Sequence, residues 1–378
     1  MKTVVTHLDY GTRLATAVVL VVAVALVPLV IALWPHPDKS MAGTYTSAVL
    51  SDVTYSDCDN VTDDVPCGEA TGTLDDDKQV EVMLFRDAWL SHVTDSDRAI
   101  VYASESPDSG TVYTFHSHDR GIKLIASTFI IIALVLLVVR GKGIRAIASL
   151  VASAIFIWAF LVGGIAAGGS PLLYTTISII LVLTGVLFFT HGLTTKTLAA
   201  WGGTMCGAAT AMAAGTLLST WMRLGPADES ASSLTYTNLN IDLSTLSLSA
   251  LLIALIGILN DIAAAQAATV FSHTAPDTRP QWKVIVPTAL SVGRDHSASA
   301  IYTISFSVVG AGLAAFVLAH TYNQPLSAFL QTDTVSTTLT QMLAGVIGII
   351  ITMPATTVFA LLLSRIPSTA SSSRGPKH

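Results

Sequence analysis

Eight long apolar runs constrain this chain more than any other feature of its sequence. They lie near residues 14–34, 121–139, 144–165, 172–190, 197–219, 246–271, 297–320 and 339–363. A helix needs roughly 20 apolar residues to cross the ~30 Å core of a bilayer, and in lipid each run must close its own backbone hydrogen bonds. With only 12% charged residues, a water-soluble surface could not be covered. The runs therefore predict a membrane all-α bundle of about eight transmembrane helices.

The basic residues predict how the spans are oriented. If the N-terminus is inside, 12 of the 19 Lys and Arg residues fall in cytoplasmic segments. The short outer loops 166–171 and 321–338 contain no base, and 220–245 contains only Arg223. Because short cytoplasmic loops carry the excess of Lys and Arg, both termini are expected to be cytoplasmic. The first run is long for a signal peptide, which favours an uncleaved anchor over a cleaved leader.

Residues 35–120 form a long polar segment that is strongly acidic. It holds 17 of the 25 Asp and Glu residues but only five of the 19 bases. This excess argues against nucleic acid as a partner, since phosphate binding needs clustered bases. Short runs rich in β-branched and aromatic residues, separated by Asp, Gly, Pro and Ser, predict a small extracytoplasmic β-rich domain with antiparallel strands. The expected strands are 49–55, 79–86, 98–103 and 111–116.

Four domains follow from this division of the chain. They are a cytoplasmic N-terminus with the first transmembrane helix (1–34), the acidic β-rich domain (35–120), a seven-helix membrane domain (121–363) and a disordered cytoplasmic tail (364–378). Cys58 and Cys67 lie in the acidic domain and could form a disulfide outside the cytosol. Two cysteines alone are a weak pattern, so the free thiols stay an equal alternative.

The centre of the sixth run, residues 259–266, carries three polar side chains, Asn260, Asp261 and Gln266. An ionisable group near the centre of a span costs at least about 2.5–3.5 kcal/mol, so Asp261 must face a partner or water. Successive helical residues are rotated by about 100°, so the three side chains point in different directions, which places this helix centrally in the bundle. Asp261 either caps a helix break or pairs with a base for packing, or it forms a proton or cation site, and its cost favours the site.

The seventh run begins Gly293-Arg294-Asp295-His296. We expect Arg294 and Asp295 at the cytoplasmic end of this span, where a helix N-terminus favours the carboxylate and the arginine can reach the interface. His296 can titrate near neutral pH. A pair between Arg294 and Asp261 is a further hypothesis.

A polar stripe continues along the seventh run. Helical steps from His296 lead to Ser299, Thr303 and Ser307 on one face. The stripe either packs against another helix, with its hydroxyls bonded to the preceding turn, or lines a wet path.

The fifth run has a ridge of small residues along one face. The ridge consists of Gly203, Gly207, Ala211 and Gly215, at four-residue intervals. Such a ridge lets another helix approach closely, and it predicts tight helix packing.

The signatures of common enzymes are missing from the sequence. It has no Gly-rich phosphate loop ending in Lys-Ser/Thr, no His-Glu-x-x-His and no Gly-x-Ser-x-Gly. Asp75-Asp76-Asp77 lacks the spacing and the glycine of a calcium loop and is interpreted as a solvated turn. We therefore expect no enzyme activity, no catalytic residue, no cofactor and no metal site.

Five short segments occur in order between about residues 120 and 320. They are Arg120-Gly121, Gly169-Ser170-Pro171-Leu172, Thr190-His191-Gly192-Leu193 with Lys196-Thr197, Leu259-Asn260-Asp261-Ile262-Ala263, and Gly293-Arg294-Asp295-His296. In this combination the chain resembles the YibE/F family of bacterial membrane proteins, in its longer, actinobacterial-like form. The resemblance implies a multi-pass protein of the bacterial plasma membrane. It adds weight to Asp261 and to the 294–296 group, but it supplies no substrate.

These features favour a transporter or permease-like protein for an unidentified small solute or ion, coupled to protons or cations. Asp261 would bind the ion, His296 would relay protons, and the Ser299–Ser307 stripe would line the path. The alternative is a non-transporting scaffold or sensor whose outer domain binds an envelope partner. The expected partners are the lipid bilayer, the solute or ion, and either an envelope protein or a second copy in a homo-oligomer.

Overall fold

A computed structural model describes residues 10–36, 43–56, 67–106, 110–139, 141–224, 241–273 and 282–364. The chain forms two compact units, Met1–Pro37 with Ile144–His378, and Asp38–Gly143. Each unit has a hydrophobic core of its own.

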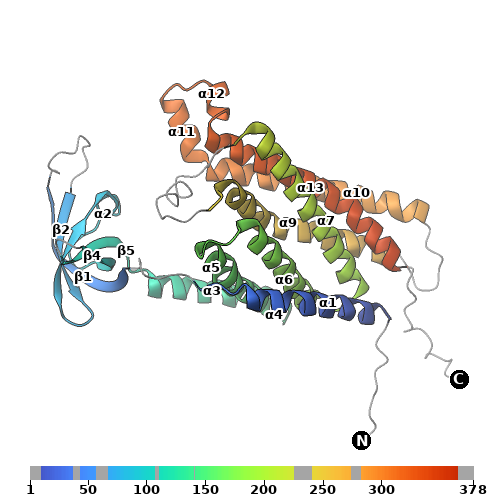
Figure 1. Cartoon of the computed structure of the whole chain (residues 1–378), viewed down its shortest axis with the longest axis horizontal. Helices are drawn as coiled ribbons and strands as arrows, with labels where there is room; N and C mark the ends of the chain where they lie inside the picture. The colour runs from blue at the N-terminus through green and yellow to red at the C-terminus, as the bar shows by residue number, and fades with distance from the viewer. Residues whose placement is uncertain are drawn as a thin grey trace, which may run out of the picture. The chain divides into compact units, whose positions relative to one another are not determined.

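The unit Asp38–Gly143 contains a closed five-stranded barrel (Figure 1). Its elements are β1 (Thr44–Ser56), β2 (Cys67–Leu74), β3 (Gln79–Leu84), α2 (Arg86–Leu90), β4 (Arg98–Ser106) and β5 (Gly110–His118). The strands are hydrogen-bonded in the order β1-β2-β3-β5-β4, and β4 also pairs with β1. This order, with a helix between β3 and β4, is that of the Greek-key barrel called the OB-fold.

Alternating side chains explain why these residues close a barrel. In β3, Val80, Val82 and Leu84 are buried in the core, whereas Gln79 and Glu81 are exposed. The predicted β-rich domain is confirmed as a small barrel, but the prediction missed β2, whose two glycines and one acid replace the expected large apolar residues. The expectation of antiparallel strands was wrong for one pair, because β3 and β5 run parallel.

The rest of the described chain is helical. Its elements are α1 (Tyr10–Ala32), α3 (Gly121–Val139), α4 (Gly141–Phe156), the π-helix η1 (Ile157–Val162), α5 (Gly163–Ala166), α6 (Pro171–His191), α7 (Thr195–Met222), α9 (Leu243–Ser272), α10 (Trp282–Ala311), α11 (Leu313–Thr321), α12 (Leu326–Leu330) and α13 (Asp333–Ser364). Of these, α3 belongs to the same unit as the barrel.

Six helical stretches of the described chain are long and apolar enough to cross a membrane, and the pair α10–α11, bent by 55°, would be a seventh. The six are α1, α3, the stretch Gly143–Ala166, α6, α9 and α13. The predicted span 197–219 is also helical, in the 28-residue α7, but the many Gly, Ala and Thr residues of α7 lower its hydropathy. By length and composition, six or seven of the eight predicted spans are therefore found.

The core of the helical unit is built on close contact between α7 and α13, which lie side by side (Figure 1). A side chain at Gly203 would collide with Thr356, and one at Gly207 would collide with Thr352. Both glycines belong to the predicted small-residue ridge, so the tight packing expected of that ridge is confirmed. Helix α9 packs against both α7 and α13, and also contacts α6 and α10.

Candidate functional site

Gln266 on α9 shows how α9, α10 and α13 are aligned. Its side chain is buried, and its Nε2 donates to the carbonyl oxygen of Ala289 on α10 at 2.9 Å and to Oγ1 of Thr357 on α13 at 2.7 Å. The amide nitrogen therefore uses both of its N–H groups. Gln266, predicted as a binding residue, holds three helices in register.

The contact of Gln266 with Ala289 places the other predicted residues of α9 and α10 at the same height along the two helix axes. Helices α9 and α10 are antiparallel, since Gln266 lies beside Gly293 while Leu255 and Ile304 meet at Gly345. Asp261 precedes Gln266 by five residues and Arg294 follows Ala289 by five. With a rise of 1.5 Å per residue, both lie about 7.5 Å from the contact in the same direction.

We call Asn260, Asp261, Arg294, Asp295 and His296 the polar layer. Helices α9 and α10 are each 30 residues long, and the polar layer lies close to the middle of both. Measured along α9, Asp261 is roughly 16 Å from the C-terminal end, about half of a bilayer core.

The prediction that Arg294 and Asp295 lie at a helix N-terminus was wrong. Helix α10 begins at Trp282, not at Gly293, so this group lies inside the helix. The hydropathy of the sequence placed the span after the charges, whereas the residues before them continue the same helix. The 294–296 group is therefore level with Asp261 and not beside the end of α10.

The ionisable side chains of the polar layer are exposed and unpaired within the described chain. Asp261, Arg294, Asp295 and His296 are all exposed, and none has a hydrogen-bond or ion-pair partner among the described residues. The hypothesised pair between Asp261 and Arg294 is not formed within one chain. The ion pairs of the described residues join Arg98 to Asp75 and to Asp119, in the unit that contains the barrel.

Asp261 lies on an exposed face of α9 that is otherwise made of small residues. This small-residue face consists of Ala250, Ala254, Gly257 and Asp261, at steps of four, three and four residues. A Cβ atom at Gly257 would meet nothing within 4 Å. The opposite face of α9 carries the buried Leu255, Leu259 and Gln266. The described part of the chain therefore leaves Asp261 uncovered.

The polar stripe on α10 is open as well. His296, Ser299, Thr303 and Ser307 are all exposed. The Thr303 hydroxyl donates to the carbonyl oxygen of Ser299 at 3.0 Å, a bond to its own helix. No described helix packs over the stripe, and both interpretations of it stay predictions.

Two atoms beside the exposed charges have unused hydrogen-bonding capacity. Oδ1 of Asn260 and Oγ of Ser297 are buried and have no hydrogen-bond partner among the described residues. Asn260 directly precedes Asp261, and Ser297 directly follows His296. Both atoms are exceptions, because buried polar groups are normally hydrogen-bonded. Ser297 was not predicted, because its position gave no signal of its own beside His296.

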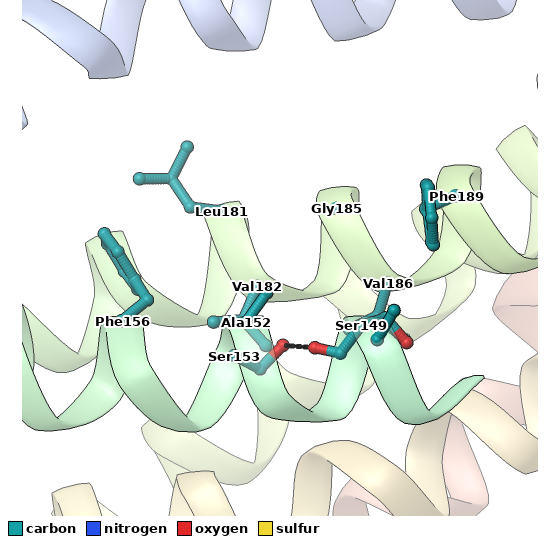
Figure 2. A pocket seen from close by; sticks show the side chains of 10 residues that line it. Ser149, Ala152, Ser153, Phe156, Leu181, Val182, Gly185, Val186 and Phe189 are labelled. Atoms are coloured by element: carbon teal, nitrogen blue, oxygen red, sulfur yellow. Dashed lines mark hydrogen bonds between the residues drawn. The ribbon is translucent and has the colours of Figure 1, made fainter. Parts of the chain in front are cut away.

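A pocket of about 460 Å³ lies between α4 and α6 (Figure 2). Its lining is almost wholly apolar, with Phe156 on α4 and Phe189 on α6. The hydroxyls of Ser149 and Ser153 point to carbonyl oxygens of their own helix, at 2.9 Å and 2.7 Å, so they are already hydrogen-bonded. The chemistry of this pocket suits a hydrocarbon chain and not a polar solute.

The barrel carries an acidic hollow that the sequence did not predict. The hollow is about 390 Å³ and lies over β1, β2 and β3. Asp52, Glu69 and Glu81 line it, with Thr54, Thr71 and Gln79 between them. Among the described residues, no group of three or more His, Cys, Asp or Glu side chains is arranged to hold a metal ion.

The described residues include only one of the two cysteines that were predicted to form a disulfide. Cys67 is disulfide-bonded and Cys206 is a free thiol. Cys58 lies outside the described residues, so its pairing with Cys67 stays a prediction.

Apolar helices of spanning length, with ionisable side chains at their middle, define an integral membrane protein. The model of the YibE/F-like protein family matches residues 127–365, more than half of the chain. The chain belongs to this family, and the resemblance found in the sequence is confirmed. No curated protein and no solved structure matches the chain.

Proposed function

We propose that this YibE/F-family membrane protein is a permease-like transporter for a small solute or ion, and that the polar layer is its binding site. One observation carries the proposal: charged side chains lie at mid-helix without a partner among the residues that the structure describes. A charge at the bilayer centre costs at least about 2.5–3.5 kcal/mol and almost always faces a cavity or a partner.

The roles follow from the chemistry of each group. The Asp261 carboxylate can bind a cation or a proton, and the His296 imidazole can accept a proton and pass it on. Ser299, Thr303 and Ser307 supply hydroxyls along the same helix face as His296, where a partly dehydrated ion needs them. Transport would be coupled to protons or cations through Asp261.

We also propose that α7 is an eighth span, with both termini in the cytoplasm of a bacterium. Its low hydropathy suits a helix that packs against protein, because small residues mark helix contacts in membranes. Its neighbours α9 and α13 are both of spanning length. An even number of spans and the basic loops then put both chain ends on the cytoplasmic side.

Thermal unfolding of the full-length protein in detergent tests the binding site. We predict that protons, Na⁺, K⁺, Mg²⁺ or Ca²⁺ stabilise the wild type but not Asp261→Asn, because the amide keeps the shape and removes the charge. Saturation at 100 times Kd would contribute about 2.7 kcal/mol. Asp333→Asn, an exposed carboxylate at the start of α13, is the matched control and should respond as the wild type does.

The alternative is a membrane scaffold or sensor whose barrel binds an envelope partner, and the acidic hollow over β1–β3 is the observation in its favour. Under this alternative the polar layer only holds helices together. Asp261→Asn would then change the basal melting temperature or nothing, and none of the ions would distinguish the two proteins. That result would reject the transporter.

A further inference from the structure

The small-residue face of α9 has the character of a helix contact, yet no described helix covers it. All four of its members, Ala250, Ala254, Gly257 and Asp261, are exposed. In lipid, small residues mark the faces on which another helix can approach closely. A carboxylate on such a face cannot be left against hydrocarbon chains. Whatever covers this face has to supply a partner for Asp261.

Arg294 is the cation at the required depth. It lies level with Asp261 and is itself exposed and unpaired among the described residues. Every other Lys or Arg of the described helices lies within five residues of a helix end. At the middle of the described helices, the chain therefore offers one base, and that base needs an acid as much as Asp261 needs a base.

We infer that a second copy of this chain packs on the small-residue face of α9, and that Arg294 of each copy pairs with Asp261 of the other. In a two-fold symmetric dimer the same surface is used on both copies, so this ion pair forms twice. Both unpaired charges are then satisfied without any other component. The dimer does not depend on the proposed transport function. Its argument needs only that α9 and α10 lie in the membrane.

A second copy fits the charges better than the remaining spanning helix does. Helix α3 has no buried residue, so it also has surface to offer to another helix. However, it carries no acid, and its one base, Lys123, is its third residue. It has no cation at the depth of Asp261 and no acid for Arg294. Lipid has neither at that depth.

Charge exchange between copies tests the pairing directly. The full-length chain is co-expressed with two different affinity tags, and co-purification from the membrane is measured. Asp261→Arg leaves two cations at the contact and Arg294→Asp leaves two anions, so each variant should fail to co-purify with itself. The mixed pair is complementary at both contacts, so it should recover wild-type co-purification. If the two residues paired within one chain, mixing would recover nothing.

Bulk at Gly257 gives a test that does not depend on charge. Gly257→Leu should lower co-purification about tenfold, equivalent to 1.4 kcal/mol, without disturbing its own chain, because nothing lies within 4 Å of the new Cβ. Gly185→Leu on α6 is the matched control, since that glycine is equally open, and it should leave assembly unchanged. The dimer is rejected if wild-type copies do not co-purify or if Gly257→Leu assembles normally. Neither readout depends on transport.

Discussion

Polar side chains inside the helical unit divide into those that their own chain satisfies and those that it does not. Gln266 bridges three helices, and the hydroxyls of Thr352 and Thr356 donate to carbonyl oxygens of α13 at 2.8 Å and 2.7 Å. Asp261 and Arg294 have no such partner among the described residues. The sequence identified Gln266, Asp261 and Arg294 equally well, but it could not predict which of them the chain would satisfy, because the rotation of a helix about its own axis depends on packing.

Asp242 is a satisfied polar residue whose effect depends on pH. It caps α9, and its Oδ1 accepts from the Ser244 hydroxyl at 2.8 Å and from the Ser244 amide at 3.0 Å. The hydrogen bond from the Ser244 hydroxyl is the largest effect and lowers the pKa of Asp242. Burial has the next largest effect and raises it, but the pKa stays below its ordinary value. The folded state therefore favours the charged carboxylate.

We predict that Asp242→Ala lowers the free energy of unfolding by about 1 kcal/mol near neutral pH, as loss of an N-cap does. Because the folded-state pKa is lowered, the electrostatic part of this stabilisation is present above the unfolded pKa of about 3.9 and is lost as the pH falls through the folded pKa. Melting curves of wild type and variant should converge on acidification. A difference that stays constant to low pH would contradict the prediction.

At the scale of elements, the contact between α7 and α13 depends on the absence of side chains. The four-residue spacing of the ridge was enough to predict the contact but not its partner, because several spans could have supplied the facing surface. A similar spacing of small residues, Ala250, Ala254 and Gly257, forms the small-residue face of α9, which was not predicted. The start of α10 could not be found, since hydropathy cannot distinguish a charged group that ends a span from one that lies within it.

Two glycine-to-alanine substitutions should change the free energy of unfolding in opposite directions. Gly207→Ala places a Cβ against Thr352 and 3.0 Å from the carbonyl oxygen of Gly348, so we expect a loss of about 1–3 kcal/mol from overpacking. Gly185→Ala meets nothing within 4 Å, so it should gain up to about 1 kcal/mol from helix propensity. Thermal melting in one detergent measures both. Equal effects would mean that α7 and α13 are not in close contact.

At the scale of the whole molecule, the sequence predicted a membrane bundle and a small β domain, and both are present. Strand β2 and the parallel pairing of β3 with β5 were not predictable, because glycines obscure the alternation and a Greek-key order is set by contacts distant in sequence. The acidic hollow depends on that order, since β1, β2 and β3 contribute to it together.

The orientation of the bundle is testable through two exposed positions, Lys196 at the start of α7 and Gln324 between α11 and α12. If α7 crosses the membrane, three spans separate them and they lie on opposite sides. We predict that an impermeant maleimide on intact cells labels Gln324→Cys and not Lys196→Cys, both in a Cys206→Ser background. Labelling of both positions, or of neither until the cells are opened, would mean that α7 does not cross.

The aromatic cluster around Phe160 has a mechanical consequence. Phe160 in η1 is fully buried, with ring centroids 5.0 Å from Tyr174 on α6 and 6.1 Å from Trp34, which follows α1. The Tyr174 hydroxyl also donates to the carbonyl oxygen of Leu33 at 2.9 Å. The end of α1 and the start of α6 are thus joined by packing and a hydrogen bond, while Gln266 joins α9, α10 and α13. The first group meets α9 through α6, and both α1 and α6 also contact α7, so any relative motion of the two groups would have to repack all three contacts.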